Sequence, residues 1–488
     1  MMALRMLSTS LISAALLMSV GCSNLDSTTS LQSSSAEQRI SSLAALSKHD
    51  PVTRTLDIQE WHTSAGTKVL FMAAPELPMF DLRLTFAAGS SKDQHAYGLA
   101  NLTSAMLDEG TGALNAGQIA TQFEDLGADF SSGSYRDMAV ISLRSLSDPK
   151  LSAPALELFS KIAAQPSFPA DSLARIKNQL LAGFEYEKQN PGKLASLALF
   201  EKLYGEHPYA KPSSGDAKSV PALTRQQLQD FHRTYYNANN AQIALVGDLT
   251  LEQAKTISEK VSAGLPRGTA AAITAKPKAN IASKTHIEFP STQTHILLAQ
   301  LAVKRGDPDY PALFLGNQIL GGGGFGTRLM EEVREKRGLT YGIYSGLSPM
   351  QAAGPFMINV QTRAQLSDVT LQLVQDLLRD YIANGPTETE LANAKRESLG
   401  SFPLSAASNS AIVGQLAAIG FYDMPLTWMN DFMQDLQKLS VKDVHAAFQR
   451  HLNPDQLVIV TAGPTVEQLP LPEPVERSEQ PTAVERQH

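Results

Sequence analysis

The sequence predicts an α+β fold of two homologous domains, each a mainly antiparallel sheet packed with helices. Three features predict it: an internal repeat, strands of alternating polarity, and amphipathic helices between the strands. The stretch LTRQQLQDFHRTYYNANNAQIALVGD from Leu223 aligns, at an offset of 216, with LSVKDVHAAFQRHLNPDQLVIVTAGP from Leu439. Each copy predicts an amphipathic helix, a turn that contains Asn, and a strand that ends at Gly. We expect Thr224 and Ser440 to cap the two helices, because a hydroxyl accepts from the free amides of a first turn.

A second pair of matching stretches lies in the same order along the chain. FEDLGADFSSGSYRDMAVISLRSLSDPKLSAPALELFSKI corresponds to VREKRGLTYGIYSGLSPMQAAGPFMINVQTRAQLSDVTLQLVQDL. In both stretches a helix ends at a glycine (Gly127 and Gly338), extended segments follow, and an amphipathic helix returns. Two matches in one order indicate that the chain arose by duplication. The expected strands alternate with period two: MFDLRLTFAAG, DMAVISLRSL, THILLAQLAV and PFMINVQTR.

The repeat sets the expected domain boundaries. The first domain runs over 51–265 and the second over 285–468, joined by a Pro-, Gly- and Ala-rich linker at 266–284. Residues 469–488 are rich in Pro and charge, and we expect them to be disordered.

The N-terminus predicts export from the cytoplasm. Residues 1–21 have the basic start and short apolar run of a signal peptide. Cys22, the only cysteine, follows Gly21 and resembles a bacterial lipoprotein cleavage site, although Ser19 stands where Leu is usual; ordinary secretory cleavage is the alternative. Residues 22–50 predict a flexible tether. We therefore expect a lipid-anchored protein of the bacterial envelope, at the outer membrane and facing the periplasm.

Composition excludes one class of partner. The 488 residues are 43% apolar and 18% charged, with a net charge of -7. No basic field is present to concentrate phosphates, so nucleic acid is not expected as a partner.

Three motifs carry a resemblance to a known family. They are AAGSSKDQHAYGLANLTSAMLDEGT, LYGEHPYAKPSSGDAKSVPALTRQQLQDFHRTYYNANNAQIALVGD and LGGGGFGTRLMEEVREKRGLTYGIYS. With them the chain resembles the pitrilysin/insulinase family of zinc peptidases, in the short-subunit branch that includes the mitochondrial processing peptidase. The resemblance covers residues 51–468. It implies that the two domains face each other as half of a clamshell.

The resemblance also shows where this chain departs from the family. Members carry His-x-x-Glu-His on one helix, in which two imidazoles bind zinc and the Glu activates the metal-bound water. Here Asn101, Ser104 and Ala105 occupy the three positions. The apolar stripe of Leu99, Leu102 and Met106 still predicts a helix.

No other residues replace the missing ligands. The family's third ligand is a Glu about eighty residues further on, where Glu185 or Glu187 stands, but one carboxylate cannot hold zinc. The histidines have no pair at helical spacing, and we expect each to be a surface or turn residue: His95, His207, His232, His445 and His451. The chain is therefore predicted to bind no metal of its own, and zinc is expected on a partner chain.

The second domain keeps the family's other motif. The resemblance implies that Arg334 and Tyr341 reach toward a zinc site, bind substrate carbonyls and support the developing negative charge. The alternative for Arg334 is a solvent-facing residue of a charged helix. Gly321, Gly322, Gly323 and Gly324 are expected to form a turn with positive φ before Thr327 caps the next helix, and to form no phosphate-binding loop.

The function that the resemblance implies is that of a non-catalytic subunit of a heterodimeric zinc metallopeptidase. A homologous chain would bring the zinc, and peptides or unfolded segments would be the substrates. The alternative is a catalytically inert peptide-binding or scaffold lipoprotein of the same fold. No Ser/His/Asp arrangement supports a solitary hydrolase.

Overall fold

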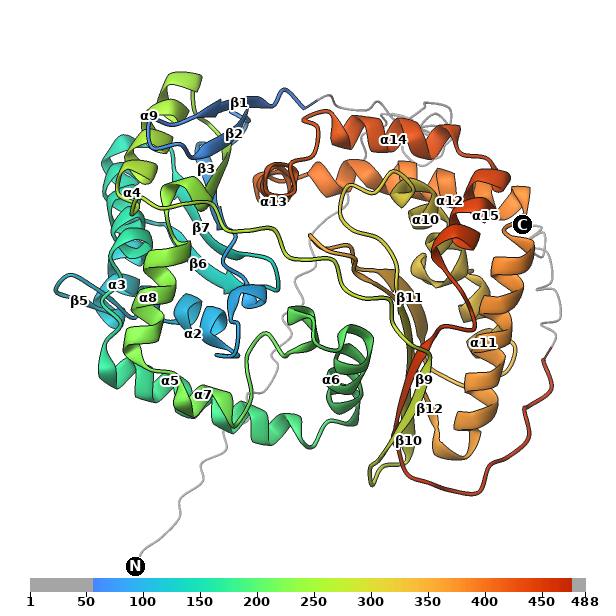
Figure 1. Ribbon diagram of the computed structural model, residues 1–488. Helices are drawn as coiled ribbons and strands as arrows, with labels where there is room; N and C mark the ends of the chain where they lie inside the picture. The colour runs from blue at the N-terminus through green and yellow to red at the C-terminus, as the bar shows by residue number, and fades with distance from the viewer. Residues whose placement is uncertain (1–55, 476–488) are drawn as a thin grey trace, which may run out of the picture. The chain divides into compact units, whose positions relative to one another are not determined.

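The computed structural model describes residues 56–475. The predicted signal peptide, Cys22 and the tether lie outside these residues. Two sheets form the centre of the described chain (Figure 1), and we call the parts that hold them the first half (residues 56–265) and the second half (residues 283–475).

The first sheet has six strands in the order β1-β2-β8-β3-β7-β6, and all neighbours are antiparallel except β2 and β8. The strands are β1 Gln59–His62, β2 Lys68–Ala73, β3 Met79–Phe86, β6 Asp129–Ser134, β7 Ala139–Leu146 and β8 Ala241–Gly247. A separate two-stranded sheet joins β4 Gly110–Thr111 and β5 Leu114–Asn115.

The second sheet repeats this topology without the extra edge strand. Its order is β11-β12-β10-β13-β9, and only β13 and β9 are parallel. The strands are β9 Ser283–Glu288, β10 Gln293–Leu301, β11 Ile343–Leu347, β12 Pro355–Arg363 and β13 Val458–Gly463. The α+β prediction with two mainly antiparallel sheets is confirmed.

The helix–turn–strand repeat is visible in the structure. Helices α8 (Arg225–Tyr235) and α15 (Val441–His451) lead into β8 and β13. Thr224 accepts a hydrogen bond from the amide of Gln227, and Ser440 accepts one from the amide of Asp443. Both predicted N-caps are confirmed, each as part of a reciprocal capping box.

Most helices of each half lie against its own sheet, and α6 and α13 are the exceptions. The first half has α2 Leu99–Ala105, α3 Ala116–Asp125, α4 Pro149–Ala164, α5 Ala170–Glu187, α6 Pro191–Tyr204, α7 Ser219–Ala222, α8 and α9 Leu251–Ala263. The second half has α10 Tyr310–Asn317, α11 Ser367–Asn384, α12 Glu388–Ser401, α13 Asn409–Phe421, α14 Trp428–Lys438 and α15. Two π-helical segments, Gln318–Gly322 and Met330–Glu335, follow α10.

The other face of each sheet is covered by a helix from the opposite half. Helix α13 packs Leu416 and its neighbours on β2 and β8 of the first sheet, in a cluster that includes Leu70 and Val246. Helix α6 lies beside the second sheet (Figure 1), and its Leu199 packs with residues of β10 and β13. The two halves therefore exchange helices that occupy equivalent places in the repeat.

A buried carboxylate joins the halves beside these helices. Asp137, in the turn between β6 and β7, is 4% exposed. It accepts hydrogen bonds from the hydroxyls of Tyr209 and Tyr422 and from the amide of Gln351, the last at 2.8 Å. Tyr209 belongs to the HPY sequence of the first half, whereas Tyr422 and Gln351 belong to the second half. One carboxylate thus satisfies three donors from distant parts of the chain.

Two segments without regular structure are nevertheless fixed by hydrogen bonds. Between the sheets, His207 Nε2 lies 2.8 Å from the carbonyl oxygen of Ala275, within the expected linker. At the C-terminus, the amides of Leu469 and Val475 donate to the carbonyl oxygens of Gln365 and Lys336, at 2.8 and 2.7 Å. Residues 469–475, which we expected to be disordered, are therefore held along the second half by backbone hydrogen bonds that composition does not reveal.

Within residues 56–475, no single helix has the length and hydropathy to cross a membrane. One bent pair, Glu388–Ala406 with Asn409–Phe421, passes on length and composition alone, with a bend of 101°.

Candidate substrate-binding site

Helix α2 is started by a buried carboxylate. Asp93 accepts hydrogen bonds from the amides of Gly98 and Ala100, each at 2.8 Å. Burial raises the pKa of Asp93 to about 7, although the two amides act in the opposite direction. Gly98 has a φ of +91°, and a Cβ there would lie 2.8 Å from the carbonyl oxygen of Ser214. The start of α2 is therefore fixed by contacts that need no metal.

The three degenerate motif positions lie on α2 without a metal-binding set. Asn101 is partly exposed, Ser104 is buried, and Ala105 packs against the core of the first half. Ser104 Oγ lies beside the buried Tyr236 hydroxyl, and among the described residues neither oxygen has a well-oriented hydrogen-bond partner. An amide, a hydroxyl and a methyl group do not supply the imidazole or carboxylate ligands that Zn²⁺ takes in proteins.

The two glutamates near the expected third-ligand position form surface ion pairs instead. Glu185 lies 2.6 Å from Lys188 Nζ, and Glu187 lies 3.0 Å from Lys193 Nζ.

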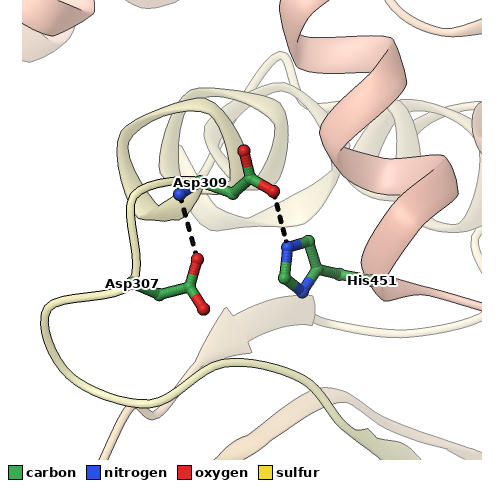
Figure 2. Close-up of side chains that lie close together, drawn as sticks. All are labelled: Asp307, Asp309 and His451. Atoms are coloured by element: carbon green, nitrogen blue, oxygen red, sulfur yellow. Dashed lines mark hydrogen bonds and ion pairs between the residues drawn. The ribbon is translucent and has the colours of Figure 1, made fainter.

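Within residues 56–475, one cluster brings three potential metal ligands close together, and it lies in the second half. Figure 2 shows Asp307 and Asp309, from the loop that leads into α10, beside His451 at the end of α15. Arg450 donates to both carboxylate oxygens of Asp309, at 2.9 and 2.7 Å, and His451 Nε2 lies 2.8 Å from one of them. The hydrogen bonds from Arg450 are the main reason that the pKa of Asp309 is lowered. A permanent guanidinium charge opposes a divalent ion, so this cluster is an ion-paired joint between α10 and α15.

His232 does not have the surface position that we expected. It is 6% exposed on α8, and its Nε2 lies 2.9 Å from the carbonyl oxygen of Ala163. The ring stacks on Tyr236, with the ring centroids 4.9 Å apart. A lone histidine in the sequence did not show which face of the helix packs inward.

Arg334 lies in the π-helical segment Met330–Glu335. Its guanidinium carbon lies 4.7 Å from the centre of the Phe325 ring, and its NH1 lies 3.3 Å from Glu335. The Phe325 ring is 75% exposed and belongs to the glycine-rich loop. Single π-helical turns recur at functional sites, and this one directs Arg334 over an exposed aromatic ring.

Tyr341 lies between this segment and strand β11, with its side chain 91% exposed. No hydrogen bond or ring contact joins it to Arg334 in the part of the chain that the structure describes. Tyr344, on β11 itself, is 55% exposed. β11 is an edge strand of the second sheet, and Tyr341 and Tyr344 lie at its N-terminal end.

The glycine-rich loop differs from the expected turn. Of the four glycines at 321–324, only Gly324 has a positive φ, at +79°. Gly321 and Gly322 end the π-helical segment Gln318–Gly322, and a Cβ on Gly321 would lie 2.7 Å from Ser345 Oγ. Close packing against β11, rather than backbone conformation, therefore requires the first of these glycines. Thr327 accepts a hydrogen bond from the amide of Met330 at 3.4 Å, which agrees with its expected capping role.

A pocket of about 920 Å³ surrounds Arg334. Phe325, acidic and basic side chains of the segment 331–337, and Pro474 and Val475 line it, whereas Tyr341 does not. Phe325 was not predicted as a site residue, and its only sequence signal is its place after four glycines.

Known proteins share this fold. Residues 68–217 match the description "Insulinase (Peptidase family M16)", and residues 222–398 match "Peptidase M16 inactive domain". A crystal structure of a peptidase M16 inactive domain from Pseudomonas fluorescens is 61% identical, with a TM-score of 0.84, over 85% of this chain and 100% of that one. A protease structure from Helicobacter pylori, 18% identical, has a TM-score of 0.78 over 84% and 100% of the two chains.

These matches define a two-sheet chain of the zinc-peptidase type. The chain belongs to peptidase family M16, the insulinase family. Among curated relatives, a "Non-peptidase homolog YmxG" from Helicobacter pylori is 25% identical over 79% of this chain and 89% of its own length. An uncharacterized zinc protease from Mycobacterium tuberculosis is 24% identical over 78% and 88%.

Proposed function

We propose that this chain is the non-catalytic, substrate-binding subunit of a heterodimeric zinc metallopeptidase that degrades or processes peptides in the bacterial periplasm. Two relatives with "inactive domain" or "Non-peptidase homolog" in their names support a chain without hydrolysis of its own. The side chains of Asn101, Ser104 and Ala105 support it independently, because they offer no zinc ligand.

The main observation in favour of substrate binding is the exposure of Tyr341. A tyrosine that is 91% exposed at a strand edge stabilises its own fold little, so its side chain is free to contact another molecule. Arg334 offers a fork of permanent donors and Tyr341 a neutral hydroxyl donor. Both groups suit a peptide carbonyl whose oxygen gains negative charge during hydrolysis. The zinc on the partner chain would supply the activated water.

An extended peptide fits the edge at which these residues lie. Within residues 56–475, β12 is the one strand that pairs with β11, and on the other side of β11 the Ser345 carbonyl oxygen accepts from Asn317 Nδ2 at 3.3 Å. An added peptide would therefore use main-chain groups of β11 on either side of Ser345. A peptide that adds to such an edge gains backbone hydrogen bonds, and side chains beside the edge select its sequence.

The test mixes the purified chain with a homologous chain that carries His-x-x-Glu-His. We expect peptide hydrolysis only in the mixture, and its loss on addition of chelator. Tyr341→Phe or Arg334→Ala should lower kcat/KM by about a hundredfold or more, the scale of losing one oxyanion donor. Tyr186→Phe and Arg379→Ala are matched controls, because they change an exposed tyrosine on α5 and an exposed arginine on α11. Full activity of the Tyr341 and Arg334 variants would reject a role in the reaction.

A catalytically inert peptide-binding or scaffold lipoprotein is the second candidate. The name of the Helicobacter pylori relative favours it. Under this alternative the mixture hydrolyses peptides no faster than the zinc-bearing chain alone, while the two chains still associate.

The proposed location depends on Cys22. Lipidation of this residue would hold the chain at the outer membrane with its folded part in the periplasm. Cys22→Ala should then move the protein from the membrane fraction to the soluble periplasmic fraction. An unchanged membrane fraction would argue against the anchor.

A further inference from the structure

A second pocket lies at the contact between the two halves, away from Arg334. It has a volume of about 390 Å³. The first half contributes Arg83 and Thr85 from β3 and Arg136 from the β6–β7 turn, and the second half contributes Arg305 and Tyr422. Its wall from helix α13 is made of small residues, namely Gly414, Ala417 and Ala418, which leave the space open.

The pocket holds three guanidinium groups and one carboxylate. Within residues 56–475, none of Arg83, Arg136 and Arg305 has a carboxylate within ion-pair distance. The carboxylate is that of Asp137, whose oxygens already accept from two tyrosine hydroxyls and one amide. Asp81, two residues from Arg83 on β3, is bound by Arg144 at 3.0 and 3.3 Å. Three guanidinium groups at the pocket therefore stand against one carboxylate, that of Asp137, which leaves an excess of positive charge.

The individual contacts leave donors unused. Arg83 donates from Nε to Ser142 Oγ at 3.4 Å. Arg136 donates from Nε to the carbonyl oxygen of Tyr209 at 3.3 Å, and burial lowers its pKa. These contacts engage one nitrogen of each guanidinium.

Two further polar atoms at the pocket are buried without a partner. Thr85 is 1% exposed, and its Oγ1 has no hydrogen-bond partner among the described residues. Arg305 Nε is likewise buried and unpaired, with the guanidinium 5.4 Å from the centre of the Tyr422 ring. Buried polar atoms in folded proteins are nearly always hydrogen-bonded, so unpaired ones beside a pocket point to a missing ligand.

We propose that this pocket binds a small oxyanion, a carboxylate or phosphate group, between the two halves of the chain. Guanidinium groups bind both kinds of oxyanion through paired N–H donors. Thr85 supplies a hydroxyl donor from the first sheet. A volume of about 390 Å³ admits a small molecule and no folded partner.

Calorimetric titration of the purified chain with inorganic phosphate and with citrate tests this site, in chloride buffer of constant ionic strength. We expect saturable binding of at least one probe. The dissociation constant should rise at least about tenfold in Arg83→Gln and in Arg305→Gln. Arg379→Gln, which changes an exposed arginine of α11 already paired with Asp376, should bind like the unaltered chain. Binding of phosphate or of citrate decides which oxyanion the site prefers.

Melting curves in chloride alone show whether each variant folds. If an arginine variant misfolds, Thr85→Val keeps the side-chain shape, removes the buried hydroxyl and should still weaken binding. The proposal is overturned if neither probe binds saturably, or if folded arginine and Thr85 variants bind as tightly as the unaltered chain. Activity with a zinc-bearing partner does not enter this test, so its result is independent of the proposed function.

Discussion

At the residue scale, the burial of His232 makes the stability of the fold depend on pH. Burial lowers the pKa of His232 to about 4, against about 6.5 for an unfolded histidine. The neutral ring therefore stabilises the fold above pH 6.5, and this contribution is lost as the pH falls from 6.5 toward 4. Its size is at most about 3 kcal/mol.

Urea unfolding at pH 7.5 and at pH 4.5 checks this expectation. His232→Gln keeps an N–H donor for the carbonyl of Ala163 and has no charge to gain. The variant should therefore lose less free energy of unfolding between the two pH values than the unaltered chain. His62→Gln, at an exposed position of β1, should leave the loss unchanged. Equal losses in His232→Gln and the unaltered chain would contradict the assignment.

The sequence predicts a hydrogen bond when the two partners are a few residues apart, and it does not predict one between distant parts of the chain. Thr224 and Ser440 were found because a cap bonds three residues away. Asp137 and Tyr422 are 285 residues apart, and no local sequence pattern predicts their hydrogen bond. For the same reason the sequence did not predict that Arg450 pairs with Asp309, or that the arginines of the second pocket lie together.

At the element scale, the exchange of α6 and α13 makes each sheet depend on the opposite half. Leu416 of α13 is fully buried against the first sheet. Leu416→Ala should lower the free energy of unfolding by about 2–5 kcal/mol, the cost of a core cavity. Leu404, 73% exposed shortly before α13, should change stability by no more than about 0.5 kcal/mol when replaced by Ala. Similar losses in the two variants would mean that α13 does not pack on this sheet.

The sequence predicted the strands but not this exchange. Strand β8, which the repeat predicted, is buried along its whole length. On the side of β8 that α13 covers, Ala244 and Val246 pack on the helix, and Gln242 donates to the carbonyl oxygen of Ala417 at 3.1 Å. No pattern within β8 identifies the covering helix. The helix expected around Arg334 is likewise a π-helical segment, Met330–Glu335, and the polarity pattern of the sequence does not distinguish the two helix types.

At the scale of the whole molecule, Asp137 should hold the two halves together. Asp137→Asn replaces one accepting oxygen with an NH₂ group that faces other donors. We expect the free energy of unfolding to fall by about 2–4 kcal/mol, because buried donors lose their partner. Urea unfolding in one buffer measures the change.

Asp423→Asn is the matched control for this joint. Asp423 also crosses between the halves, to Lys68 at 3.1 Å, but its side chain is 92% exposed. Its loss should cost no more than about 1 kcal/mol. Equal effects at Asp137 and Asp423 would show that the buried joint contributes no more than a surface ion pair.

At the scale of the whole chain, the first half keeps the peptidase fold, but the three positions of its zinc motif carry no residue that binds zinc. Asn101, Ser104 and Ala105 occupy a helix that Asp93 starts and the core supports. Elemental analysis of the purified chain, after dialysis against buffer with trace zinc, measures this directly. We predict no stoichiometric zinc in the chain alone. One zinc per chain, with peptide cleavage that a chelator abolishes, would contradict the account.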